Sequence, residues 1–241
     1  MSKTAIEVNN LNVSYISMKS KSIRNNLFSF KEPKKIVHAL KDVSFSLNEG
    51  EILGVVGKNG SGKSTLLNTI AGIFSPDTGT INLYGNKTSL LSIGVGFQRE
   101  INGRDNIYLN GMLLGFSEKY IDSKINEIIE FSELGEFIDM PIKSYSSGMY
   151  SKLAFSIVAV LETDIILIDE ALSVGDVKFR KKSGNKMREI ISKQDKTAVI
   201  VSHQESSLRQ LCTKILWLND GEIKMYGDTD KVLNAYVDFM K

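Results

Sequence analysis

The chain has 241 residues, of which 42% are hydrophobic, and its formal net charge is +2. The length fits one large α/β domain, or one with a helical insertion, and the charge is too small to indicate a nucleic-acid partner. The single cysteine, Cys212, excludes an internal disulfide and fits a reducing compartment. The N-terminus lacks an apolar signal core, and the longest apolar stretch, 154–161, is too short for a bilayer, so we do not expect the chain itself to be a membrane protein.

The first 36 residues divide into two parts of different character. Residues 5–15 alternate as an edge strand does and end in Tyr15, which is either an exposed strand-end residue or a ring that stacks on adenine. Residues 16–36 carry six lysine or arginine side chains against one acid, Glu32. Their spacing over 22–30 allows a short amphipathic basic helix for a membrane surface or an anionic partner, with a solvated loop as the alternative.

A phosphate-binding loop follows two further alternating runs, 36–40 and 43–47, and a turn at 48–50. Residues 51–56 are apolar and predict a buried strand, 66–71 have helical spacing, and the sequence between them matches Gly, four residues, Gly-Lys-Ser. Such a loop turns its backbone N–H groups inward to hold phosphate. Lys63 can reach the β- and γ-phosphates, and the Ser64 hydroxyl is a candidate magnesium ligand. The residues expected to hold the nucleotide are Gly57, Lys58, Asn59, Gly60, Ser61, Gly62, Lys63, Ser64 and Thr65.

The middle of the chain changes from strands to helices. Strands are predicted at 80–84 and 89–93, with turns at 75–79 and 85–86. Residues 104–160 are predicted to be helical. The first helix is capped by Asp105, the second begins at Ser117 with four isoleucines on one face, and the third covers 153–161.

Strand and helix alternate again from residue 164. The run 165–168 is wholly apolar and predicts a central parallel strand that ends in Asp169 and Glu170. A basic amphipathic helix at 179–191, a buried strand at 197–202, a hairpin of 214–218 with 223–226, and a last helix at 232–239 follow. Ligands of α/β sheets bind at the carboxyl ends of the strands, where these two acids lie.

Four polar residues near the ends of the predicted strands would have separate roles in binding and hydrolysing a nucleoside triphosphate. Asp169 would hold magnesium, directly or through water, and Glu170 would polarise the attacking water, unless the pair only begins a helix. His203, after the next strand, is placed to hydrogen-bond a γ-phosphate. Gln98, which precedes the helical stretch, can contact magnesium or water through its amide.

At this point the chain resembles the nucleotide-binding subunits of ABC transporters over nearly its whole length. Residues 57–65 match the Walker A motif and 165–169 match Walker B, with Glu170 as the catalytic glutamate. Gln98 falls at the Q-loop, His203 at the switch histidine, 173–176 at the D-loop, and Tyr15 at the aromatic position that stacks on adenine. The family signature Leu-Ser-Gly-Gly-Gln is replaced by Tyr-Ser-Ser-Gly-Met, which keeps Ser146 and Gly148, the phosphate-contacting pair, around Ser147.

The resemblance implies a fold and a division of the chain. The fold is an α/β phosphate-loop NTPase with a RecA-like core, an antiparallel β subdomain and an α-helical subdomain. Residues 1–97 and 162–241 would form the core with the β subdomain, and 98–161 the helical subdomain, with 16–36 as a basic insertion. ATP and Mg²⁺ are the implied cofactors, with Ser64, Gln98 and Asp169 as the metal set.

The altered signature is similar to that of exporters of lipid-linked polysaccharides, and residues 131–137 look most like the teichoic-acid branch. The resemblance therefore implies a peripheral ATPase on the cytoplasmic face of the cell membrane. It would form a homodimer that completes each site with Ser146–Gly148 of the other copy. It would serve a membrane permease that carries the polysaccharide, and it would have no carbohydrate-binding domain.

Four alternatives are weighed against this interpretation. An importer ATPase is the nearest, and the signature variant argues against it. A soluble ABC ATPase acting on nucleic acid usually has two ATPase units or long coiled-coil insertions. A GTPase or kinase would be expected to carry Asn-Lys-x-Asp, which 86–89 lacks. A regulatory module without activity would not need Lys63, Asp169, Glu170 and His203 together.

Overall fold

The computed structural model of the chain describes residues 3–17, 35–91, 96–169, 176–192, 196–202 and 204–241. Several predicted features therefore lie outside the described residues. These are Glu170, His203, most of the D-loop, the end of the strand predicted at 89–93, and nearly all of the basic segment 16–36 with its predicted helix.

The first sheet is antiparallel and combines β1 (Thr4–Ser17), β2 (Lys35–Asn48) and β4 (Thr78–Asn82) in the order β2-β1-β4. The prediction of β1 as an edge strand is wrong, because β4 returns from far along the chain to pair with its second side. The two runs predicted within 36–47 form one strand. Asp42, at a φ of 51°, interrupts the alternation at an irregularity in the pairing, where a bulge changes the side-chain pattern without ending the strand.

The second sheet has six strands in the order β5-β6-β7-β3-β8-β9. They are β3 (Ile52–Val56), β5 (Thr88–Leu91), β6 (Ile165–Asp169), β7 (Thr197–Val201), β8 (Lys214–Asn219) and β9 (Glu222–Asp228). The prediction that β6 is a central, buried, parallel strand is confirmed. The predicted hairpin of β8 and β9 is also confirmed. It turns at Asp220 and Gly221, which both have positive φ, as a tight hairpin turn requires.

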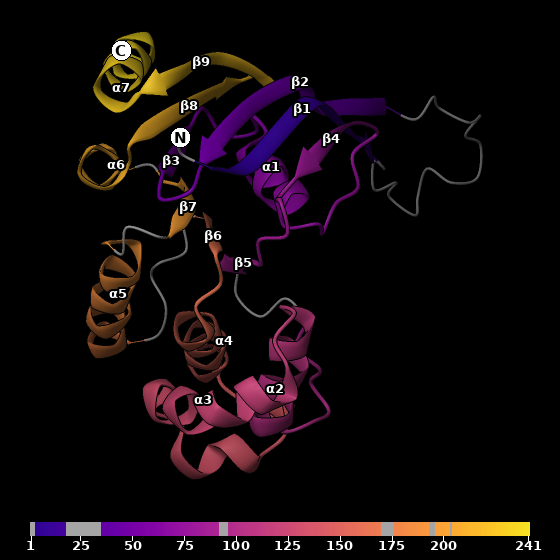
Figure 1. Cartoon of the computed structure of the whole chain (residues 1–241), viewed down its shortest axis with the longest axis vertical. Helices are drawn as coiled ribbons and strands as arrows, with labels where there is room; N and C mark the ends of the chain where they lie inside the picture. Colours follow the sequence, from indigo (N-terminus) through magenta and orange to yellow (C-terminus); the bar gives the residue numbers. More distant parts are fainter. Residues whose placement is uncertain (1–2, 18–34, 92–95, 170–175, 193–195, 203) are drawn as a thin grey trace, which may run out of the picture.

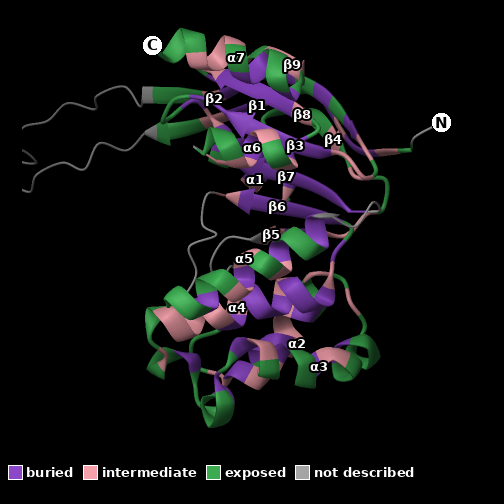
Figure 2. Ribbon diagram, turned by 90° about the vertical axis from the view of Figure 1, so that its left-hand side faces the viewer, coloured by how far each residue is buried: buried purple, intermediate pink, exposed green. Residues whose placement is uncertain are grey.

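Helix α1 (Lys63–Ile70) lies between the two sheets, and Leu66, Leu67 and Ile70 are buried there with side chains from both sheets. Helices α5 (Val177–Ser192), α6 (Glu205–Leu211) and α7 (Thr229–Met240) pack their apolar residues on the other face of the six-stranded sheet. Figure 1 shows these layers, and Figure 2 shows the buried residues concentrated in the strands between them. Helix α6 was not predicted, since its seven residues are too few to show a helical repeat.

The helical part hangs below the sheets in Figure 1 and has its own apolar core. It consists of α2 (Gly103–Leu113), α3 (Glu118–Ser132), two short 3₁₀ turns at Gly135–Asp139 and Ile142–Ser144, and α4 (Ser147–Leu161). Among the described residues, no helix is long and apolar enough to cross a membrane.

Capping side chains decide where these helices begin, and they correct two predictions. Asn102, not Asp105, caps α2, because its side-chain oxygen accepts the Asp105 backbone N–H at 2.7 Å. Ser117 caps α3 as predicted. The third helix begins six residues earlier than the predicted Leu153, since Ser146 caps it by accepting the N–H of Met149. A serine cap is effective even where the first turn lacks an apolar repeat.

Candidate active site

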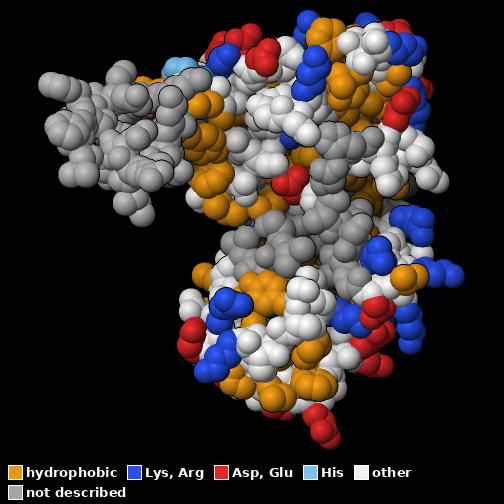
Figure 3. Space-filling view, turned by 180° about the vertical axis from the view of Figure 1, so that it is seen from behind, with side chains coloured by type: hydrophobic (Ala, Val, Ile, Leu, Met, Phe, Trp, Pro, Cys, Tyr) orange, Lys and Arg blue, Asp and Glu red, His pale blue; other side chains and the backbone are white. Residues whose placement is uncertain are grey.

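A cavity of about 480 Å³ lies where the predicted phosphate loop meets the ends of β1, β2, β6 and β7. It is lined by Tyr15, Val37, His38, Ala39, Asn59, Gly60, Gly62, Lys63, Ser64, Thr65, Asp169 and Val201. Residues that are 154 positions apart in sequence, Tyr15 and Asp169, therefore line one space together with the phosphate loop. Figure 3 shows hydrophobic side chains gathered on the upper part of the molecule. Tyr15 and Ile16 of β1 and Ile36 and Val37 of β2 are among the exposed hydrophobic residues.

Two glycines let the phosphate loop fit closely against its neighbours. A Cβ at Gly57 would overlap the carbonyl oxygen of Leu218 at the end of β8. Gly62 has a φ of 105° and begins α1, and a Cβ there would lie 2.5 Å from the carbonyl oxygen of Ala39. The first amides of α1 have no acceptor within the helix, so they face the cavity as donors for an anion.

The polar groups of the loop fit a phosphate ligand. Lys63 Nζ donates to the carbonyl oxygens of Gly57 at 2.8 Å and Lys58 at 2.9 Å, which places its ammonium group inside the curve of the loop. The Ser61 hydroxyl oxygen is buried and has no hydrogen-bond partner among the described residues, a cost that ordered water would remove, and Ser61 is not among the residues that line the cavity. Ser64 and Asp169 line the same cavity, and hydroxyl and carboxylate oxygens are the ligand types that Mg²⁺ prefers.

Tyr15 lines the cavity from β1, next to the phosphate loop. Its hydroxyl donates to Thr65 Oγ1 at 3.1 Å, and its ring meets Phe74 edge-on with the centroids 5.7 Å apart. The ring keeps 36% of its surface exposed and so retains a face for a flat apolar ligand. Val37, which pairs with Tyr15 across the strands, and Ala39 also line the cavity. Sequence reasoning missed both, because the strand register that brings them here includes a bulge.

Two predicted elements lie in the helical part and do not line this cavity. Gln98 follows the strands, and its backbone is held from both sides by Asn106, whose side chain accepts the Gln98 N–H at 2.8 Å and donates to its carbonyl at 3.0 Å. Ser146, Ser147 and Gly148 form the start of α4, where the serine side chain caps the helix. Asn106 is a further site residue that no sequence signal singled out.

The comparisons with known proteins agree with this arrangement. The family model described as ABC transporter matches residues 40–173, which is more than half of the chain. The chain belongs to the ABC transporter family. An O-antigen export system ATP-binding protein of Klebsiella pneumoniae is 42% identical over 198 residues, which is 82% of this chain and 80% of the relative. The teichoic acids export ATP-binding protein TagH of Staphylococcus haemolyticus is 43% identical over 237 residues, covering 96% of this chain and 89% of the relative.

The length of the relatives varies. The TagH protein of Bacillus anthracis is 45% identical over 204 residues, but the match covers 85% of this chain and only 37% of that protein. Among solved structures, an ATP-binding subunit of an ABC transporter has a TM-score of 0.74 at 20% identity, covering 97% of this chain and 93% of the other. A dimeric ATP-binding cassette bound to ADP and Pi has a TM-score of 0.71 at 21% identity, covering 93% of this chain and 98% of the other. The predicted ABC ATPase fold class is thereby confirmed.

The altered ABC signature has a structural basis at its first residue. The Tyr145 hydroxyl donates to the carbonyl oxygen of Phe137 at 2.7 Å, which joins the residue before the α4 cap to the first of the two 3₁₀ turns, Gly135–Asp139. Burial raises the pKa of Tyr145 to about 12, and the charge of Asp139 adds to the shift. A Cβ at Gly103 would overlap the tyrosine hydroxyl, so the start of α2 leaves room for it.

A second feature joins the signature helix to the end of the D-loop. Lys152 of α4 pairs with Asp176 at 2.9 Å and with Glu133 at 3.4 Å, and Lys182 of α5 pairs with Glu133 at 3.0 Å. Asp176 also accepts the backbone N–H of Phe179 at 2.9 Å and so caps α5. The hydrogen bond from Lys152 lowers the pKa of Asp176 to about 2, with the Phe179 N–H adding to the shift. These four side chains, which we call the junction network, connect α3, α4 and α5.

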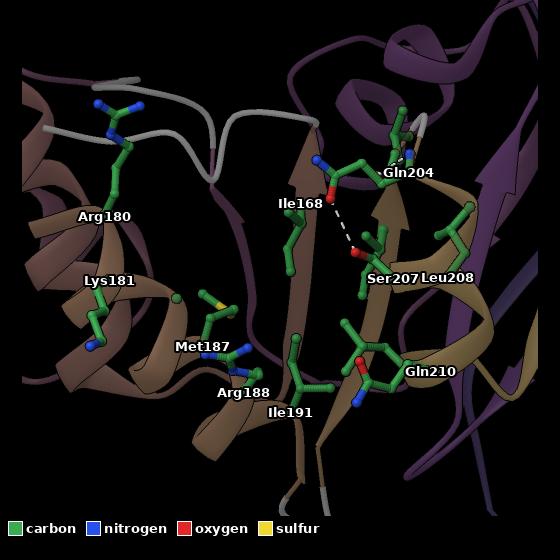
Figure 4. A pocket seen from close by; sticks show the side chains of 15 residues that line it. Ile168, Arg180, Lys181, Met187, Arg188, Ile191, Gln204, Ser207, Leu208 and Gln210 are labelled. Atoms are coloured by element: carbon green, nitrogen blue, oxygen red, sulfur yellow. Dashed lines mark hydrogen bonds between the residues drawn. The ribbon is translucent and has the colours of Figure 1, made fainter. Parts of the chain in front are cut away.

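A separate cavity of about 470 Å³ lies between α5 and α6 over β6 and β7 (Figure 4). Its floor is apolar, with Ile168 and Ile191 among its residues, while Arg180, Lys181 and Arg188 project from α5. Figure 4 shows the hydrogen bond from Ser207 to the amide oxygen of Gln204, 3.1 Å long, beside it. The phosphate loop, Tyr15 and Asp169 do not line this space, so it is not part of the candidate active site.

We expect Tyr145→Phe to lower the free energy of unfolding by about 1 kcal/mol, because the hydrogen bond that ties Tyr145 to the turn at Gly135–Asp139 is lost, while the Met140 N–H still donates to the Phe137 carbonyl. Urea unfolding of the purified chain measures this difference. Tyr84→Phe serves as the matched control, since Tyr84 donates to Glu7 on the exposed surface and its loss should cost less. Equal stability of Tyr145→Phe and the wild type would contradict this role of the hydroxyl.

Asp176→Asn should reduce the loss of stability that the chain shows as the pH falls from 4.5 to 2.5. The lowered pKa of Asp176 means that its ion pair contributes above the unfolded value of about 4 and is lost as the pH falls towards about 2. Urea midpoints at pH 4.5 and pH 2.5 should therefore differ more in the wild type than in the variant. Asp176→Ala, which also loses the cap, should be less stable than Asp176→Asn at pH 7. Identical acid profiles would argue against the ion pair.

Proposed function

We propose that this ABC ATPase hydrolyses ATP to drive export of a lipid-linked cell-surface polysaccharide of the teichoic-acid, O-antigen or capsule type. The observation that carries the proposal is identity of 41–45% to ATP-binding proteins of O-antigen and teichoic-acid export systems, over most of this chain. The cavity at the phosphate loop supports the ATPase part, because it combines an anion site, Asp169 and an aromatic ring. An importer or small-molecule exporter is the alternative.

The chain's own residues account for binding and orientation of the nucleotide. Tyr15 and Val37 offer an apolar platform for adenine, and Lys63 with the amides of the loop would meet the phosphates. Ser64 and Asp169 line the cavity and would hold Mg²⁺, which neutralises charge on the phosphates when bound, and Gln98, which lies outside the cavity, would have to approach them to complete the metal set. Glu170 would orient the attacking water, and His203 would donate a hydrogen bond towards the γ-phosphate.

A second copy of the chain would complete the site. Ser146, Ser147 and Gly148 begin a long helix, where amide donors and the helix dipole favour an anion, yet they do not line the cavity of their own chain. A twofold dimer would let each copy present this helix start to the other copy's nucleotide, and the two sites would be equivalent. Bound ATP would then hold the dimer closed.

A membrane permease is the proposed partner on the cytoplasmic face of the cell membrane. An apolar groove of about 320 Å³ lies between α1, β5, α2 and α4, next to Phe97 and close in sequence to Gln98. Ile73 and Leu113 line it and are 43% and 66% exposed, respectively. Burying such side chains against a permease segment is favourable, and it would link the partner to the Gln98 region.

Glu170→Gln should bind ATP but lower its turnover by about a hundredfold or more, because the amide cannot accept the proton of the attacking water. Phosphate release measures turnover, and size-exclusion chromatography with ATP should show a dimer that persists. Glu136→Gln, on the exposed surface of the helical part, is the control for loss of a carboxylate. Turnover near the wild-type rate in Glu170→Gln would rule out its catalytic role.

Leu113→Glu tests the partner and the cargo together. The charge in the apolar groove should leave ATP hydrolysis by the isolated chain unchanged but abolish co-purification with the permease. In the host cell, staining of the exported surface polymer should fall severalfold. Met112→Glu is the matched control, because Met112 is also exposed but does not line the groove. A normal polymer surface with lost uptake of a solute would instead support the importer alternative.

A further inference from the structure

The last turn of α7 touches the phosphate loop. The Lys58 ammonium lies over the ring of Phe239, 5.0 Å from its centroid. No carboxylate among the described residues pairs with Lys58, so this ring is the partner that the structure gives its charge. Lys224 of β9 lies over the same ring at 4.8 Å. Phe239 is 44% exposed, and cation–π contacts of this kind are weak but directional.

Lys58 also connects this contact to Lys63. The carbonyl oxygen of Lys58 accepts a hydrogen bond from Lys63 Nζ at 2.9 Å, and that of Gly57 accepts one at 2.8 Å. The side chain of Lys58 is therefore held by α7, while its backbone holds the ammonium group that faces the phosphates. The ring of Phe239 is thus linked to Lys63 through two contacts, the cation–π contact with Lys58 and the hydrogen bond from Lys63 to the Lys58 carbonyl.

Phe239 is itself held firmly against the sheet. Its ring lies 5.0 Å from that of Trp217, which sits on β8 opposite Val56, the last residue before the phosphate loop. Trp217 is buried, and the ring of Tyr236 covers it at 5.5 Å. The start of α7 is fixed by its Asp228 cap and by the Thr229 hydroxyl, which donates to the carbonyl of Cys212 at 2.8 Å. The ring is thus presented to Lys58 from a rigid support.

We propose that Phe239 is a positioning residue for the phosphate loop, which keeps Lys58 turned away from the nucleotide and the loop in its binding shape. The proposal rests on the proposed ATPase function and adds α7 as an element that sets ATP affinity. Preorganising a loop lowers the entropy lost on binding, so removing the ring should weaken ATP binding without changing the chemical step. Phe239 touches no reacting atom and is not catalytic.

Kinetics of ATP hydrolysis by the full chain provide the main test. Phe239→Leu keeps an apolar side chain but removes the ring face, and it should raise KM about two- to fivefold with kcat unchanged. Phe239→Tyr should restore the wild-type KM. Lys224→Met is the matched control, because it removes the other lysine from the same ring and should leave KM unchanged. A wild-type KM in Phe239→Leu would overturn the proposal.

A double-mutant cycle separates positioning from a general structural effect. Lys58→Met should raise KM to the same extent as Phe239→Leu, and combining the two should add nothing further. Additive effects of the two substitutions would overturn the proposal. The buried Cys212 thiol, whose pKa burial raises to about 12, should resist labelling in every folded variant. If Phe239→Leu fails this check, Phe239→Met takes its place in the cycle, with the same expected rise in KM.

Trp217 supplies a signal that does not depend on turnover. It is the only tryptophan of the chain, and it contacts Phe239 directly. Titration with ATP should change its fluorescence in the wild type, and the change should be smaller in Lys58→Met. An ATP-dependent change without hydrolysis would leave this inference standing while the proposed activity fails. If the titration curve of Lys58→Met matches that of the wild type, this inference fails while the proposed ATPase function still stands.

Discussion

The phosphate loop depends on close backbone contact with the β8–β9 hairpin. Gly57 lies so near the carbonyl of Leu218 that a methyl group would not fit, and the N–H of Gly221 donates to the carbonyl of Ser61 at 3.2 Å. The loop therefore packs directly against the end of β8 and the turn of the hairpin. Any account of nucleotide binding by this chain has to include the hairpin and α7 as well as the motif itself.

The candidate active site lies at the sheets, whereas the start of α4 lies in the helical part. The junction network connects the two parts, because it joins α4 to α5. Glu133, Lys152, Asp176 and Lys182 carry balanced charge, and a cluster of Phe131, Phe155 and Phe179 packs beneath them with ring centroids about 6 Å apart. Because Lys152 and Ser146 share one helix, a movement of Asp176 would reach the helix start as a rigid displacement. Lys152 is largely shielded from solvent while Asp176 is exposed, so the ion pair between them lies at the edge of the packed helices.

Much of this fold is predictable from the sequence, and the failures have physical causes. The phosphate loop, the buried strand before Asp169, the hairpin and the serine cap of α3 follow from local patterns of residues. The central place of β1 does not, because its second neighbour, β4, is some seventy residues away. The pairing of Val37 with Tyr15 also cannot be predicted from the local sequence, because a bulge at Asp42 shifts the register between β1 and β2. Asn106 and Phe239 act through contacts that no short motif encodes.

The packing of Tyr145 against Gly103 has a consequence for how this signature can change. The hydroxyl occupies the volume that a side chain at residue 103 would need, and the carbonyl of Ile138 closes the same space. A side chain at residue 103 would therefore overlap the Tyr145 hydroxyl, and the Ile138 carbonyl would crowd it as well, so glycine is the residue that fits beside this tyrosine. The unusual signature is thus protected by a glycine more than forty positions away.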